Sequence, residues 1–144
     1  MKVVDTNLLL YSVNADAPQH GRCRAWLENA LAGDEIIGFD WIVVAGFLRI
    51  ATSPRVFPQP FTVQEAVQQA SNWLSAPVAR NPATTGDHWT ILEELLLAVG
   101  TARNLATDAH LAALAISHNA TLVSCDTDFA RFRRLKWENP LAVP

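Results

Sequence analysis

The sequence contains few residues of the kinds that mark membrane, secreted or zinc-binding proteins. Charged residues make up only 17% of the chain, and there are two cysteines. No apolar run reaches the roughly 18 residues that a membrane-spanning helix requires, and the first residues lack the pattern of a secretory signal. Two cysteines are too few for a disulfide framework or a four-thiolate zinc site, so we expect Cys23 and Cys125 to be reduced and partly buried. These absences favour a cytoplasmic protein.

The four histidines are scattered and form no HxxxH or HExxH pair, which argues against a zinc enzyme. A net charge of −3 argues against a general surface for polyanions. Nine of the eleven basic residues are arginine, however, and arginine suits bidentate contacts with phosphate. Half of the residues are hydrophobic and the chain has 144 residues, which together predict one folded domain over 1–144.

Short apolar runs alternate with longer helical patterns along the chain. The predicted strands cover 2–4, 35–39, 78–80 and 121–124, with a final edge strand around Trp137. The predicted helices cover 6–13, 19–31, 41–52, 62–74, 87–99 and 107–118, with a short helical turn over 126–132. Thr62 and Glu65 form a capping box, and Thr107 is the candidate N-cap of the last long helix. Strands that alternate with helices predict an α/β fold with a mostly parallel sheet.

Three aspartates that lie far apart in the sequence are expected at one edge of this sheet. Asp5 directly follows the first strand and Asp126 follows the strand over 121–124, so both lie at the carboxyl edge, where open parallel sheets bind ligands. Asp108 lies in the first turn of the helix that leads into that strand, and this helix begins at the same edge. Taken singly, the three have simpler roles as a helix cap, a partner of the helix dipole and the start of a turn. Together they favour a functional site.

The chemistry of crowded carboxylates indicates what such a site would bind. Carboxylates at close range repel one another unless a cation or shared protons offset the repulsion. Ligands that are all oxygen suit Mg²⁺ or Mn²⁺, and such an ion lowers the pKa of water and stabilises the charge of a phosphate displacement. No serine or cysteine nucleophile has an obvious histidine partner, so water is the expected attacker. The residues therefore favour a metal-dependent nuclease.

Several segments resemble the motifs of PIN-domain ribonucleases. They are VVDTN at 3–7, NLATDAHLAALA at 104–115 and ATLVSCDTDF at 120–129. The stretch over 41–55, which contains GFLRIAT, resembles a mycobacterial-type branch of the VapC toxins. The resemblance covers nearly the whole chain, with the motifs in the family's order. It implies a PIN-like α/β/α sandwich with a mostly parallel central sheet of about four to five strands.

The resemblance also implies an activity and a set of site residues. It implies a cytoplasmic endoribonuclease toxin that cleaves RNA with Mg²⁺ or Mn²⁺ and is held inactive by a VapB-like antitoxin. By motif position, Asp5, Asp108 and Asp126 are the implied catalytic residues and metal ligands, and Asp128 is a further implied ligand. Thr6 and Asn7 are expected to steady the pocket by hydrogen bonds, with the start of a helix as their alternative role.

One position departs from the family pattern. Many PIN toxins have a glutamate in the helix after the second strand, where this chain has Gly46. The pocket is therefore expected to have one carboxylate fewer, which leaves open whether it binds one metal ion or two. Asp40 begins that helix at the same sheet edge, and we hypothesise that it partly substitutes; its alternative role is a simple N-cap. Arg49 and Arg131 are candidate contacts with the substrate.

Other classes of protein fit the sequence less well. A haloacid dehalogenase phosphatase would need a second aspartate where Asn7 stands, and a response-regulator receiver domain would need an acidic pair near the first strand. The alternative that remains is a PIN-like module that binds RNA or an antitoxin without cleaving RNA. Five tryptophans and the apolar helix over 41–50 mainly predict core packing, and secondarily a homodimer interface or a groove for an antitoxin helix.

Overall fold

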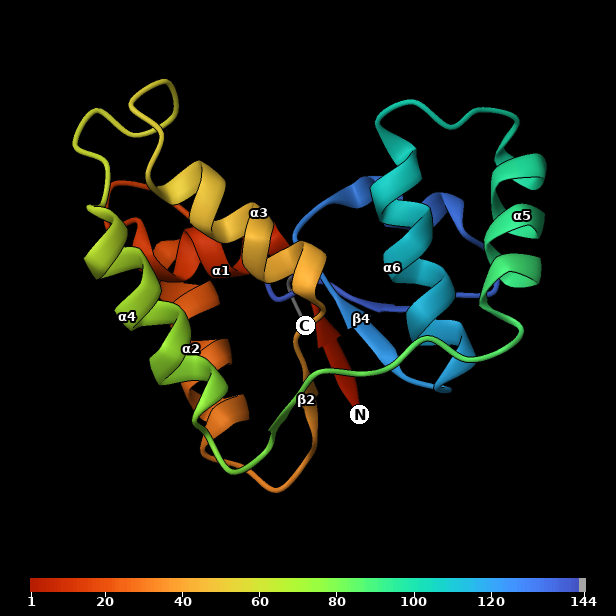
Figure 1. Ribbon diagram of the computed structural model, residues 1–144, viewed down its shortest axis with the longest axis horizontal. Coiled ribbons are helices and arrows are strands. Elements are labelled where there is room, and N and C mark those ends of the chain that lie inside the picture. The colour runs from red at the N-terminus through yellow and green to blue at the C-terminus, as the bar shows by residue number, and fades with distance from the viewer. Residues whose placement is uncertain (143–144) are drawn as a thin grey trace.

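A parallel sheet of five strands forms the centre of the computed structural model, which describes residues 1–142 (Figure 1). The predicted domain runs to residue 144, and its last two residues lie outside the described residues. The strand order is β3-β2-β1-β4-β5, and every pair of neighbours is parallel. The strands are β1 (Lys2–Val4), β2 (Ile37–Gly38), β3 (Ala79–Arg80), β4 (Thr121–Val123) and β5 (Lys136–Glu138). The predicted α/β fold with a parallel sheet is confirmed.

Six helices flank the sheet on its two sides. On one side lie α1 (Thr6–Val13), α2 (His20–Leu31), α3 (Trp41–Ala51) and α4 (Val63–Leu74), and on the other lie α5 (His88–Val99) and α6 (Leu105–Ser117) (Figure 1). A short 3-10 helix, η1 (Thr127–Arg131), follows β4. In the described part of the chain, no helix is long and apolar enough to cross a membrane.

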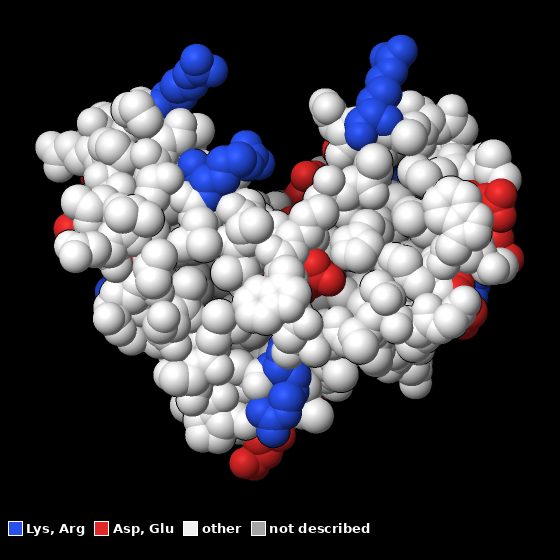
Figure 2. Space-filling view, viewed as in Figure 1, with Lys and Arg blue, Asp and Glu red and all other residues white. Residues whose placement is uncertain are grey.

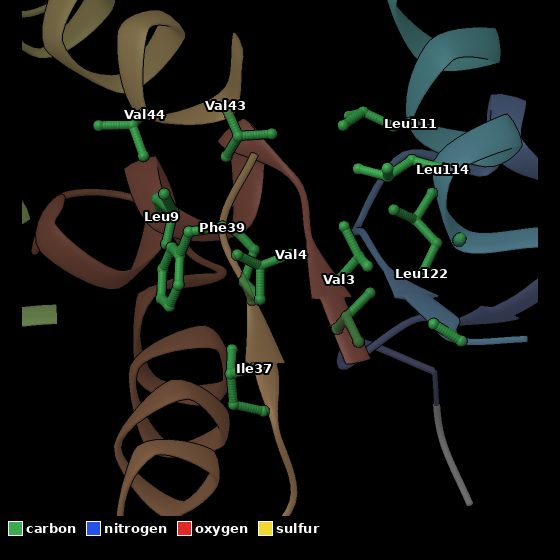
Figure 3. Packing of buried hydrophobic residues seen from close by; sticks show 14 of the residues in the cluster. Val3, Val4, Leu9, Ile37, Phe39, Val43, Val44, Leu111, Leu114 and Leu122 are labelled. Carbon is green, nitrogen blue, oxygen red and sulfur yellow. The ribbon is translucent and has the colours of Figure 1, made fainter. Parts of the chain in front are cut away.

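The core fills both faces of the sheet, because successive strand side chains point to opposite sides. Figure 3 shows Leu9 and Phe39 on the side of α1 and α3, and Leu111 and Leu114 of α6 on the other side. All four side chains are almost completely buried. The tryptophans only partly follow the expectation of core packing, since Trp73 is buried whereas Trp41 and Trp89 are 61% and 66% exposed.

The helix boundaries mostly follow the local signals in the sequence. The capping box at the start of α4 is present, with reciprocal hydrogen bonds between Thr62 and Glu65 of 3.1 and 3.0 Å. The prediction that Thr107 caps α6 is wrong, because the helix begins two residues earlier, at Leu105. Leu105 is buried in the core, which favours the earlier start, and Arg103 turns the chain in the left-handed region with φ of 43°.

The carboxyl ends of β1 and β4 meet at one level of the sheet. Val4 pairs with Val123, and the N–H of Asp5 then donates to the carbonyl oxygen of Val123 at 3.0 Å. Asp5 and Ser124 therefore leave the two strands side by side. The first turns of α3 and α6 lie at this same edge, since each helix runs antiparallel to the strands it connects.

Candidate metal centre at the sheet edge

Three carboxylates come together at the carboxyl edge of the sheet. Asp108, Asp126 and Asp128 each offer an oxygen, and these oxygens all lie within 4.8 Å of one another. Asp108 comes from the first turn of α6, whereas Asp126 caps η1. The Asp126 carboxylate accepts a hydrogen bond of 2.9 Å from the N–H of Asp128, which folds the segment so that both acids face the same space. A single cation can contact all three side chains.

Asp5 lies behind this group and is more deeply buried, with 8% of its surface exposed. Both of its oxygens already accept hydrogen bonds of 2.7 Å, one from the N–H of Thr6 and one from the hydroxyl of Ser124. Among the described residues, the group of three acids does not include Asp5. The structure thus brings together three of the four predicted metal ligands and places the fourth next to them.

Ser124 was not predicted from the sequence as a site residue, and it connects Asp5, Asn7 and Asp126 by hydrogen bonds. It is completely buried, and its hydroxyl accepts hydrogen bonds from the side-chain amide of Asn7 (3.1 Å) and from the N–H of Asp126 (3.0 Å) while it donates to Asp5. The Asn7 carbonyl oxygen in turn accepts from the N–H of Cys125 at 3.2 Å. A signal was available, because Ser124 ends the strand predicted over 121–124, at the same sheet edge as Asp5; in the structure β4 stops one residue earlier, at Val123.

The electrostatics of the pocket favour the binding of a cation. Burial raises the pKa of Asp5, against the opposing effect of the hydrogen bonds from Ser124 and Thr6. Burial, followed by the neighbouring charges of Asp5, Asp126 and Asp128, raises the pKa of Asp108 to about 6. The carboxylates are therefore costly to ionise together, and a cation would relieve that cost. An all-oxygen set of donors fits a hard divalent ion.

The structure gives a physical reason for the glycine at position 46. A Cβ at Gly46 would lie 2.9 Å from the hydroxyl oxygen and 3.3 Å from the methyl carbon of Thr6. Thr6 also donates a hydrogen bond of 3.3 Å to the carbonyl oxygen of Val43, which holds the start of α1 against α3. Thr6 thus fills the space into which a side chain from position 46 would extend.

Among the described residues, Asp40 is not part of the three-acid group, and both of its carboxylate oxygens have other partners. One oxygen accepts from the N–H of Ile42 at 2.7 Å and the other accepts from His110 Nε2 at 3.2 Å. His110 Nδ1 is hydrogen-bonded to His88 Nε2 at 3.0 Å, and His88 Nδ1 is buried without a partner. Burial raises the pKa of Asp40, but the hydrogen bonds from His110 and Ile42 outweigh it and lower the pKa. His88 and His110 are far apart in the sequence, and only the packing of α5 against α6 brings them together.

Basic side chains border the hollow that contains the acids. Figure 2 shows a notch between α3 and α6 with acidic side chains at its floor and basic side chains rising on both of its rims. Arg49 is exposed in the last turn of α3. Arg131 instead lines a separate groove of about 500 Å³ between α5 and the segment after η1, together with Glu94 and Arg134. The two predicted substrate contacts therefore lie in different places.

Comparisons with known proteins agree with this fold. A family model of the PIN domain matches residues 2–135. Ribonuclease VapC37 of Mycobacterium tuberculosis is 44% identical over 99% of this chain and 99% of that protein. Ribonuclease VapC33 of the same species is 43% identical over 98% of this chain and 99% of that protein.

Solved structures with the same fold are more distant in sequence. VapBC2 from Rickettsia felis, bound to a DNA fragment from its promoter, aligns with a TM-score of 0.68 and 21% identity over 96% of this chain and 97% of that chain. FitAcB from Neisseria gonorrhoeae aligns with a TM-score of 0.66 and 17% identity over 99% of this chain and 100% of that chain. At these identities the two structures support the fold alone.

A parallel α/β sandwich with aspartates at the carboxyl edge of its sheet defines the class of protein. The chain belongs to the PIN-domain family, and within that family it groups with the VapC ribonucleases of mycobacteria. The family membership that the sequence motifs indicated is therefore confirmed.

Proposed function

We propose that this protein is a metal-dependent endoribonuclease that hydrolyses RNA phosphodiester bonds with water and acts as the toxin of a VapBC-type toxin–antitoxin pair. The observation that carries the proposal is the group of three carboxylates formed by Asp108, Asp126 and Asp128, with Asp5 buried beside it. The names of the mycobacterial relatives, ribonucleases that share about two fifths of its residues, support the choice of RNA as substrate.

The proposed cofactor is Mg²⁺ or Mn²⁺. Asp108, Asp126 and Asp128 would hold the ion. Asp5 would be a further carboxylate ligand, and its hydrogen bonds with Ser124 and Thr6 would fix its orientation. Such an ion, when bound, lowers the pKa of water and stabilises negative charge on phosphate. With glycine at position 46 and Asp40 bonded to His110, the donor set supports one tightly held ion better than two.

The proposal extends to the setting in which the protein acts. We place it in the cytoplasm as a single nuclease domain over 1–144 that forms a homodimer and is inhibited by a VapB-like antitoxin. Exposed apolar side chains support such interfaces, because Trp41 and Ile42 at the start of α3 are left uncovered. Arg49 is proposed to contact the RNA backbone, since it is exposed in the last turn of α3, the helix that borders the notch.

A second candidate is a module that binds RNA or an antitoxin without cleaving RNA. The glycine at position 46 favours this alternative, because the pocket has one carboxylate fewer than that of many PIN toxins. The four remaining aspartates favour the enzyme.

Cleavage of RNA by the purified protein distinguishes the two candidates. Single-stranded RNA is incubated with wild-type protein and Mn²⁺, with EDTA in a parallel sample, and with Asp126→Asn in another. We expect cleavage by the wild-type protein with Mn²⁺ that EDTA abolishes and that Asp126→Asn lowers by about 100-fold or more. Asp34→Asn, at an exposed position before β2, is the matched control and should cleave normally. RNA binding without cleavage at any Mn²⁺ concentration would favour the module.

A further inference from the structure

The two cysteines meet at the back of the acidic pocket although their residue numbers differ by 102. Cys23 lies on α2 and is completely buried, whereas Cys125 is partly exposed between β4 and η1. Their sulfur atoms are 3.3 Å apart and both thiols are free. A disulfide bond is about 2.05 Å long, so the sulfurs need to approach by only about 1.3 Å to form one.

Cys125 is tied to the pocket by its backbone. Its N–H donates to Asn7, and its neighbours in the chain are Ser124, which holds Asp5, and Asp126, which belongs to the three-acid group. A displacement of Cys125 towards α2 would therefore pull on the hydrogen bonds that orient two of the acids. Cys23 lies within a helix of twelve residues, whereas Cys125 lies between β4 and η1, so we expect Cys125 to make most of the approach.

We propose that Cys23 and Cys125 form an oxidative modification site, in which a hydroperoxide converts the two thiols into a disulfide that weakens cation binding at the sheet edge. The formation of the disulfide stands on the geometry of the two thiols alone. The effect on the cation rests on the proposed function.

The reaction balances with hydrogen peroxide as the oxidant. The sulfur of Cys125, which is the more exposed of the two, attacks one peroxide oxygen. As the O–O bond breaks, the thiol proton of Cys125 moves to the departing hydroxide, which leaves as water, and a sulfenic acid remains on Cys125. The sulfur of Cys23 then attacks the sulfur of Cys125, the S–O bond breaks, and a second water leaves with the proton of Cys23. The two thiols lose two electrons and the peroxide gains them. A thiol reductant reverses the change by exchange.

The first half of the test measures the bond itself. Metal-free protein is treated with hydrogen peroxide, the peroxide is removed, and intact mass and peptide mapping are recorded before and after reduction. We expect a loss of two hydrogens and a peptide in which Cys23 is linked to Cys125, both reversed by dithiothreitol. Cys23→Ser and Cys23→Ala, used as two variants in case one fails to fold, should form no intramolecular link. A wild-type protein that yields only sulfinic or sulfonic acids, or stays unmodified, would overturn the proposal.

The second half measures cation binding by titration calorimetry with Mn²⁺ alone. Reduced, oxidised and re-reduced wild-type protein are compared with a folded Cys23 variant treated in the same way. We expect the oxidised wild-type protein to bind Mn²⁺ about tenfold more weakly, as is typical when the residues that support metal ligands are disturbed, and the re-reduced protein to recover. Equal affinity in the two states would overturn the effect on the cation. Reduced protein that binds no Mn²⁺ would contradict both the proposed function and this effect, while the mass measurement would still decide whether the disulfide forms.

Discussion

Asp108 is an acid whose ionisation in the folded protein is opposed by burial and by the neighbouring carboxylates. Its carboxyl is partly buried and faces Asp5, Asp126 and Asp128, which together with burial raise its pKa to about 6. The raised pKa means that the folded protein favours the protonated form more than the unfolded chain does. The resulting contribution to stability is fully present below the unfolded pKa of about 3.9 and is lost as the pH rises through about 6.

The substitution Asp108→Asn is therefore expected to stabilise the metal-free protein at neutral pH. Water screens part of the repulsion at this partly exposed site, so we expect a gain of about 1 kcal/mol in the free energy of unfolding at pH 7, and little difference from wild type near pH 4. Urea unfolding in EDTA at several pH values measures this. Asp34→Asn, an exposed aspartate before β2, should not change the curve. An Asp108→Asn protein that is less stable than wild type at pH 7 would contradict the electrostatic account.

The same carboxyl makes cation binding depend on pH. A metal ion competes with the proton on Asp108, so the affinity for Mn²⁺ should rise with pH and level off above about 6. Below that pH we expect it to fall by up to about tenfold per pH unit, with proton release on binding. Calorimetry in buffers of different ionisation enthalpy measures both quantities. An affinity that is unchanged between about pH 5 and pH 7 would be inconsistent with binding at Asp108.

At the scale of elements, the contact between α1 and α3 explains why position 46 carries no side chain. A Cβ there would lie 2.9 Å from the Thr6 hydroxyl oxygen. Gly46→Ala alone should therefore destabilise the protein by about 1–3 kcal/mol through overpacking. In a Thr6→Ala background the same change should be neutral or stabilising by up to about 1 kcal/mol, because alanine is the better helix former. A double-mutant cycle by chemical unfolding tests this, and additive effects would show that the two residues do not compete for space.

The elements and the acids differ in how far they can be predicted from sequence. The alternation of strands and helices predicts the parallel sheet, and strand direction alone brings Asp5 and Asp126 to one edge. The partner of Asp40 could not be predicted, because His110 and His88 come from two helices whose packing no local pattern encodes. Thr107 looked like an N-cap because its residue type fits, but the burial of Leu105 starts the helix earlier.

At the scale of the whole molecule, several large apolar side chains remain uncovered. Trp41, Trp89 and Leu97 are between 61% and 76% exposed, more than a small monomer needs to leave in water. The proposed homodimer would cover part of this surface. Light scattering should then give a mass of twice the 15.8 kDa of the chain. A single species of 15.8 kDa at micromolar concentrations would contradict the homodimer.

The central claim is that the acids at the carboxyl edge of the sheet hold a divalent cation. Crystals soaked in Mn²⁺ test it directly, because the anomalous scattering of manganese marks its position without reference to the protein. We expect one strong peak at about 2.0–2.2 Å from carboxylate oxygens of Asp108, Asp126 and Asp128, and no peak there in crystals of Asp126→Asn. The absence of a peak at saturating Mn²⁺, or a peak only beside His88 and His110, would contradict the claim.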